Sequence, residues 1–273
     1  MNLKKLLGAT TAAAGLALGA SAVSAATIDL GFALDESGSV ATSDFNLSKQ
    51  GLANALNQIP TSGPNQYRIS VIAFDSNART IIAPTIVTAG NLAGLQAQIN
   101  GIVNSQGGTD IAEAVDLLTA NFVGVGLGAE TYLNVATDGG SSANALALAA
   151  ENSNNAGVDG LSFEAIGPAN QSNLLRACYG GGANSYTDPG SGNTAAGCSL
   201  VNDPNNLPDA TQEGFVLAVD NFMDFEGAIA AKVQSIVDDT GGGGPNVVPL
   251  PAGMPLLLVG IGAFAFARTR RKS

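Results

Sequence analysis

Strand-like and helix-like stretches alternate through the middle of this chain, and this alternation limits the possible folds more than any other feature. Apolar runs of strand length recur at residues 27–34, 67–74, 80–87, 131–136, 161–166 and 215–219. Between most of them apolar residues recur at helical spacing, as in Ile111, Val115, Leu118 and Phe122. The pattern predicts an α/β fold, a doubly wound and mostly parallel sheet with helices on both faces. Pro84 places the third strand at an edge or a bulge, because proline cannot donate to a sheet ladder.

Three polar turns occur where the strands of such a sheet end or its helices begin. In chain order they read Asp35-Glu36-Ser37-Gly38-Ser39, Gly107-Gly108-Thr109-Asp110 and Thr137-Asp138-Gly139-Gly140. Taken one at a time, turns of this composition are also typical of helix caps. Ligands of doubly wound sheets, however, bind beyond the carboxyl ends of the strands, where the strand order reverses. Together the carboxylates and hydroxyls therefore favour a hard oxygen site for a divalent cation.

In this order the turns resemble the von Willebrand factor type A (vWA) domain. The metal-ion-dependent adhesion site (MIDAS) of that family is written Asp-x-Ser-x-Ser, then Thr, then Asp. The matching residues here are Asp35, Ser37, Ser39, Thr109 and Asp138. The predicted domain spans residues 26–238. The resemblance implies that these five residues coordinate a divalent cation, Mg²⁺ in the first place and Ca²⁺ or Mn²⁺ otherwise, some of the carboxylates acting through water.

The resemblance also implies a partner, because the open coordination position in this family is filled by a carboxylate from another molecule. The partner is then a protein or a surface polymer that offers an acidic group. Glu36 lies between the predicted ligands, and we expect it to point away from them as a solvated residue at the rim.

The middle of the chain is acidic and lacks histidine. The chain has 11 Lys and Arg against 22 Asp and Glu, and six of the cations lie near its two ends. The middle keeps five cations against 22 acids, a formal charge of −17. Such a surface argues against nucleic acid as a partner, because that binding needs phosphate neutralisation. With no histidine, Ser-His-Asp and Cys-His catalysis are excluded. We therefore expect no enzymatic activity.

Cys178 and Cys198 are the only cysteines of the chain. Two thiols cannot make a four-thiolate zinc site, and in an exported protein a single disulfide is expected rather than two free thiols. Residues 179–211 are rich in Gly, Asn, Ser, Asp and Pro and interrupt the strand–helix alternation. We interpret them as a structureless insertion that the disulfide pins to the domain.

The start of the chain reads as a secretory signal peptide, residues 1–25. Lys4 and Lys5 give it a basic start, residues 6–23 are small and apolar, and Val23-Ser24-Ala25 fits a small-residue cleavage site. The alternative is a buried N-terminal helix. After the domain, residues 239–247 include four consecutive glycines, Gly241 to Gly244, and are typical of a flexible linker.

Residues 248–273 read as a second targeting segment. They begin Val248-Pro249-Leu250-Pro251-Ala252, continue without charge over residues 254–267, and end in four cations among the last six residues. This layout resembles the PEP-CTERM sorting signal in its Val-Pro-Leu-Pro-Ala variant, although the common form has Glu where this chain has Leu250. The resemblance implies recognition by an exosortase, a membrane cysteine transpeptidase, and removal of the tail. The alternative is a plain C-terminal anchor in the inner membrane.

These features favour an exported binding or adhesion module at the cell surface, in the periplasm or outside the cell. It coordinates a divalent cation and uses it to bind an acidic group. An alternative hypothesis is a structural protein of the envelope or biofilm matrix, in which the domain is a scaffold and residues 179–211 are the working surface. A hydrolase with a metal-activated water is a third hypothesis, against which the missing histidine and the absence of ligands for a second metal both count.

Overall fold

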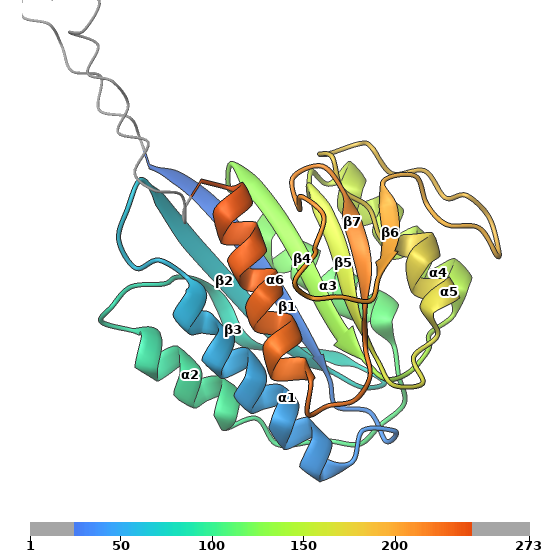
Figure 1. The fold of residues 1–273 in the computed structure, drawn as a ribbon, viewed down its shortest axis with the longest axis horizontal. Coiled ribbons are helices and arrows are strands. Elements are labelled where there is room, and N and C mark those ends of the chain that lie inside the picture. Colours follow the sequence, from blue (N-terminus) through green and yellow to red (C-terminus); the bar gives the residue numbers. More distant parts are fainter. Residues whose placement is uncertain (1–24, 242–273) are drawn as a thin grey trace, which may run out of the picture.

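The computed structural model describes residues 25–241, and these form one seven-stranded sheet between two layers of helices (Figure 1). The strand order is β3-β2-β1-β4-β5-β7-β6. All neighbouring strands are parallel except β2 and β3. The strands are β1 (Ala26–Asp35), β2 (Asn65–Phe74), β3 (Ala78–Ile86), β4 (Glu130–Thr137), β5 (Gly160–Ile166), β6 (Cys198–Val201) and β7 (Gly214–Val219). The predicted doubly wound, mostly parallel sheet is therefore confirmed.

Helices cover both faces of the sheet (Figure 1). One face carries α1 (Thr42–Ala55), α2 (Leu92–Asn100) and α6 (Phe225–Asp239). The other carries α3 (Ile111–Val125), α4 (Ala143–Asn155) and α5 (Gln171–Ala177). Within residues 25–241, no helix combines the length and the apolar character that crossing a bilayer requires.

Two hydrophobic cores, one on each face, follow from the alternation of side chains along the strands. In β1, Leu30 and Phe32 point towards α1 and α6 and are buried there. Gly31 points the other way, and a Cβ at this position would lie 2.7 Å from Leu133 Cδ2 and 3.1 Å from Phe122 Cε2. The glycine therefore lets α3 pack closely against the centre of the sheet.

The third strand lies at one edge of the sheet, as Pro84 predicts. β3 is antiparallel to β2 and pairs with no other described strand, and the register shifts near Val71. Both features suit a strand that contains a residue without a backbone N–H.

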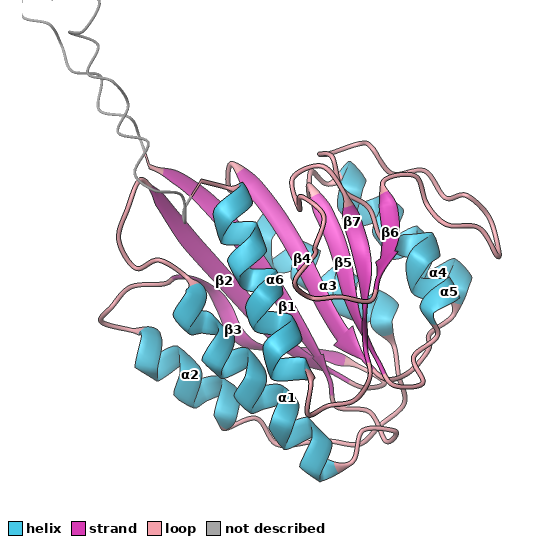
Figure 2. Ribbon diagram, in the orientation of Figure 1, coloured by secondary structure: helices cyan, strands magenta, loops and turns pink. Residues whose placement is uncertain are grey.

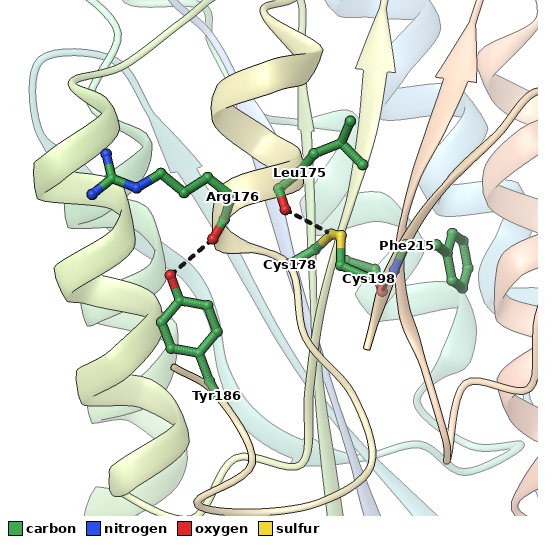
Figure 3. The surroundings of a disulfide bond; sticks show 7 residues. Leu175, Arg176, Cys178, Tyr186, Cys198 and Phe215 are labelled. Atoms are coloured by element: carbon green, nitrogen blue, oxygen red, sulfur yellow. Dashed lines mark hydrogen bonds between the residues drawn. A yellow bond between two sulfur atoms is a disulfide. The ribbon is translucent and has the colours of Figure 1, made fainter. Parts of the chain in front are cut away.

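Residues 179–211 differ from the expectation of a structureless insertion, because they contain β6. This short strand pairs with β7 in parallel and forms the second edge of the sheet. Its sequence, Cys198-Ser-Leu-Val201, is too short to be recognised as a strand next to a long run of turn residues. The predicted disulfide between Cys178 and Cys198 is present, with the two Cα atoms 5.5 Å apart (Figure 3). It joins the end of α5 to the start of β6, so it closes only the first part of the insertion.

Polar contacts also hold the insertion against the domain. Tyr186 is buried and donates a hydrogen bond to the carbonyl oxygen of Arg176 at 2.8 Å (Figure 3). The Arg176 guanidinium in turn forms a two-pronged ion pair with Asp188 at 2.7 and 2.6 Å. The insertion is thus an ordered part of the domain.

One ion pair is fully buried between α6 and the sheet. Lys232 Nζ lies 2.5 Å from Glu164 Oε1, and both side chains are 1% exposed. Neither the ammonium nor the second carboxylate oxygen makes a hydrogen bond to another described group. Burial raises the pKa of Glu164 and lowers the pKa of Lys232, and in each case the partner's charge opposes the shift.

The predicted signal peptide and the predicted sorting motif, residues 248–252, lie outside the described residues, apart from Ala25 at the end of the signal. The same holds for most of the predicted linker, since the described part of the chain ends two residues after α6.

Candidate metal centre

The three polar turns meet at the carboxyl ends of β1 and β4, in the middle of the sheet. From this pair the strand order runs outwards to β2 on one side and to β5 on the other, so β1 and β4 flank the topological switch point. Asp35 is the last residue of β1, and Asp138 directly follows β4. The connecting loops gather along this edge of the sheet (Figure 2).

Oxygen atoms of the first and third turns lie in direct contact. The Ser37 and Ser39 hydroxyl oxygens are 3.0 Å apart, and the Ser39 hydroxyl donates to Asp138 Oδ1 at 2.7 Å. Asp35 Oδ1 accepts the backbone N–H of Ser37 at 2.8 Å. This last contact is an Asx turn, which bends the chain directly after β1 and brings the two serines over the strand end.

Asp35 is buried at the base of this arrangement, with 4% of its surface exposed. Its Oδ2 accepts a 2.5 Å hydrogen bond from the Thr137 hydroxyl. Burial raises the pKa of the Asp35 carboxyl, hydrogen bonds from Ser37 and Thr137 lower it, and the charge of Asp138 adds to the increase. The pKa of Asp35 is raised overall, because the hydrogen bonds from the protein do not fully offset the cost of burying the charged carboxylate.

Thr109, in the second polar turn, lies beside the turn that carries Asp138. A Cβ built on Gly139, the residue after Asp138, would lie 3.2 Å from both Oγ1 and Cγ2 of Thr109. The structure thus brings together all five predicted ligands. Asp35, Ser37, Ser39 and Asp138 are linked through hydrogen bonds, whereas Thr109 packs beside the Asp138 turn.

The expectation that Glu36 is a solvated residue is wrong. Its side chain is 1% exposed and forms a two-pronged pair with Arg79, with Nε–Oε1 and Nη2–Oε2 distances of 3.1 and 2.7 Å. Glu36 does point away from the predicted ligands, but into the protein rather than into solvent. Sequence reasoning missed this because Arg79 lies 43 residues further on, in the edge strand.

Two further residues of this region were not singled out from the sequence. Thr137 contacts Asp35 and also accepts the backbone N–H of Gly139 at 3.0 Å. Asp75 follows β2 and contacts the loop that carries Thr109. The sequence does hold a signal for Asp75, since it stands after an apolar strand just as Asp138 does.

The donor set fits a hard divalent cation. Two carboxylates and three hydroxyls offer only oxygen, the ligand atom that Mg²⁺, Mn²⁺ and Ca²⁺ prefer. The Ser39 hydroxyl donates its proton to Asp138, so it accepts the Ser37 hydroxyl with one lone pair and keeps the other for a cation. Over residues 25–241 no group of three or more His, Cys, Asp or Glu residues is placed to hold a metal. The hydroxyls are therefore essential members of this set, and its protein charge is limited to two carboxylates.

The fold and this edge of the sheet define an α/β domain with hydroxyl and carboxylate groups at its switch point. Residues 29–193 match the von Willebrand factor type A domain family, and the chain belongs to that family. No curated protein matches the chain significantly.

Solved structures share the fold at low sequence identity. A von Willebrand factor type A protein from Catenulispora acidiphila has a TM-score of 0.56 and 14% identity, covering 77% of this chain and 42% of that one. Proximal thread matrix protein 1 from the mussel byssus has a TM-score of 0.50 and 14% identity over 77% and 46%. A second structure of that mussel protein, with a zinc-occupied MIDAS motif, has a TM-score of 0.50 and 15% identity over the same shares. The chain spans less than half the length of each.

Proposed function

We propose that this protein is an exported binding module without enzymatic activity. In this proposal Asp35, Ser37, Ser39, Thr109 and Asp138 hold a divalent cation, with Mg²⁺ first. The module uses that cation to bind a carboxylate on a protein or a surface polymer.

One observation carries the proposal, namely that donors from turns about 100 residues apart in sequence meet at the switch point. The Ser39 hydroxyl and Asp138 Oδ1 are 99 residues apart in the chain and 2.7 Å apart in space. A helix cap needs only local contacts, whereas this contact joins two separate strand ends. The zinc-occupied MIDAS motif of the mussel protein is a precedent for a cation in this fold.

In this proposal the aspartates supply negative charge to the cation, and the hydroxyl residues supply neutral oxygen ligands. Asp35 is held in place by Ser37 and Thr137, so it is oriented before any ligand arrives. Ser37, Ser39 and Thr109 add oxygen without adding negative charge. When bound, a divalent cation supplies an electrophilic centre that accepts one more oxygen, and a carboxylate of a partner fits that position.

The rest of the proposal depends on sequence features, and the two targeting signals lie outside the described residues. The signal peptide supports export, and the PEP-CTERM-like tail supports handling by an exosortase at the inner membrane. The acidic surface supports a partner other than nucleic acid. The lack of histidine supports binding rather than catalysis.

A metal-dependent pull-down tests this function. The full chain is used as bait for envelope proteins and surface polymers, with Mg²⁺ present or with EDTA. We expect retention that requires Mg²⁺ and that is lost in the Asp35→Ala/Ser37→Ala variant. The matched control is Ser43→Ala/Asp44→Ala, which removes the same two residue types from the start of α1 and should retain binding. Equal retention with EDTA would contradict the proposal.

A structural role in the envelope or matrix is the second candidate, and the edge strand β6 favours it. Among the described strands β6 pairs only with β7, so its outer edge offers backbone hydrogen-bonding groups to another chain. Deletion of residues 180–208 separates the two candidates. Loss of function with cation binding intact would favour the structural role.

A further inference from the structure

The loop that carries Thr109 has no regular structure of its own. Residues 102–110 lie between α2 and α3 and form neither helix nor strand. Backbone hydrogen bonds tie this loop to the first polar turn, from Gln106 N–H to the Glu36 carbonyl at 3.0 Å and from Gly38 N–H to the Gly107 carbonyl at 2.8 Å. At its start, the Ile102 carbonyl accepts a hydrogen bond from Lys49 Nζ at 2.7 Å. The part around Thr109 is held mainly by residues 75–79, which include the first two residues of β3 and which we call the β2–β3 turn.

Asp75 is the centre of that support. Its Oδ2 accepts the Ser105 hydroxyl at 2.6 Å and the Gly107 N–H at 3.2 Å. Its backbone carbonyl accepts the Asp110 N–H at 2.8 Å. Next to it, the Ser76 hydroxyl oxygen accepts the Gly108 N–H at 2.6 Å. Residues on both sides of Thr109 are thus hydrogen-bonded to two consecutive residues of one turn.

The two glycines before Thr109 are required by this contact. A Cβ on Gly107 would lie 2.5 Å from Asp75 Oδ2, and a Cβ on Gly108 would lie 2.9 Å from the Ser76 hydroxyl oxygen. Neither glycine has a positive φ, so their role is close approach rather than an unusual backbone conformation. The Gly-Gly pair thus belongs with Asp75 and Ser76 as one packed unit.

The same β2–β3 turn also holds the first polar turn. Arg79 binds the buried carboxylate of Glu36, which lies between Asp35 and Ser37, and its Nη2 also donates to the Val103 carbonyl at 3.0 Å. Directly before this turn, the carbonyl of Phe74 at the end of β2 accepts the Glu36 N–H at 2.8 Å. One short turn therefore contacts two of the three polar turns of the candidate metal centre.

We propose that the β2–β3 turn sets the position of Thr109 relative to Asp35, Ser37 and Ser39, and that Asp75 is the positioning residue for Thr109. Asp75 is itself no ligand in this proposal. It holds the Gly107–Thr109 backbone through a charge-assisted contact to Ser105 and Gly107. The consequence for cation binding rests on the proposed function, whereas the consequence for the loop does not.

Amide hydrogen exchange of the full chain without added metal tests the effect on the loop. In Asp75→Ala we expect the amides of Gly107, Gly108 and Asp110 to exchange about tenfold faster or more, with those of β1 and β4 unchanged. Ser105→Ala removes one of the contacts and should give a smaller increase at the same amides. Asp116→Ala, which removes an exposed carboxylate from α3, is the matched control and should change none of them. Unchanged exchange in Asp75→Ala, or an increase through the whole domain, would overturn the proposal.

Calorimetric titration with Mn²⁺ tests the effect on the candidate metal centre through a double-mutant cycle with Thr109→Val. Residues that orient metal ligands typically contribute about 10–100-fold to affinity. We expect Asp75→Ala to weaken Mn²⁺ binding by about tenfold when Thr109 is present and to have almost no effect in Thr109→Val. An equal loss in both backgrounds would show that Asp75 does not act through Thr109. If the unsubstituted chain binds no Mn²⁺ while the loop amides still respond to Asp75→Ala, the proposed function fails and the positioning of the loop stands.

Discussion

Replacing Lys232 with methionine tests whether the buried ion pair holds α6 on the sheet. Methionine keeps most of the length and apolar surface of the side chain but removes the charge, which leaves the buried Glu164 carboxylate without its cation. The carboxylate must then take up a proton to remain buried. We therefore expect Lys232→Met to lower the free energy of unfolding by about 3–5 kcal/mol at pH 7, the usual cost of breaking a buried ion pair.

The loss of stability in Lys232→Met should depend on pH in a defined direction. In Lys232→Met the folded-state pKa of Glu164 lies above the unfolded value, so the penalty is absent below the unfolded pKa and grows as the pH rises. The deficit relative to the unsubstituted protein should therefore be largest near pH 7 and should shrink towards about pH 4.5.

Urea unfolding of the full chain, followed by circular dichroism at several pH values, measures the free energy of unfolding. Glu164→Leu/Lys232→Met removes both charges and should recover most of the loss, because no buried charge remains. Lys49→Met is the control, because Lys49 has no carboxylate partner and donates only to the carbonyls of Asn100, at the end of α2, and Ile102. It should cost less than about 1 kcal/mol. A Lys232→Met deficit below about 1 kcal/mol at pH 7, or one that grows as the pH falls, would refute the reasoning.

Three further predictions concern packing, the disulfide and processing. Gly31→Ala should lower the free energy of unfolding by about 1–3 kcal/mol, because its Cβ would meet Leu133 and Phe122. The control Gly94→Ala in α2 meets open space and should raise the free energy of unfolding by up to about 1 kcal/mol. Equal effects of the two substitutions in urea unfolding would contradict this prediction. Cys178→Ser/Cys198→Ser opens a link between residues 20 apart and should cost about 3 kcal/mol, and an unchanged urea midpoint would argue against the disulfide. Mass spectrometry of the protein from cells should find a mature start near Ala26 and loss of the chain beyond the 248–252 motif; an intact chain would contradict both processing predictions.

The fold was predictable because its signals are local. Strand length, helical spacing and Pro84 each depend on neighbouring residues, and they indicated a mostly parallel sheet with β3 at one edge. The strand β6 was not predictable, since four residues among turn formers pair only because β7 lies beside them. The burial of Glu36 was missed for a similar reason, because Arg79 reaches it from a different strand.

In the candidate metal centre, too, some residues were predictable from the sequence and others were not. The family resemblance named five oxygen donors from their order and residue type, and their positions at the switch point explain why the structure places them near one another. The supporting residues Thr137 and Asp75 were missed because their importance lies in contacts across 102 and 30 residues of sequence. Sequence patterns indicate which atoms can bind a cation, whereas the residues that orient those atoms require the three-dimensional structure.

A crystal structure of the protein with Mn²⁺, located by its anomalous scattering, tests the central claim most directly. The account predicts one strong peak between the first and third polar turns, within coordination distance of the oxygens of Ser37, Ser39 and Asp138. The peak should be missing in Asp35→Ala/Ser37→Ala and present in Ser43→Ala/Asp44→Ala. A well-ordered structure with no peak there, or with Mn²⁺ bound only at other carboxylates, would contradict the assignment of this edge of the sheet as a metal centre.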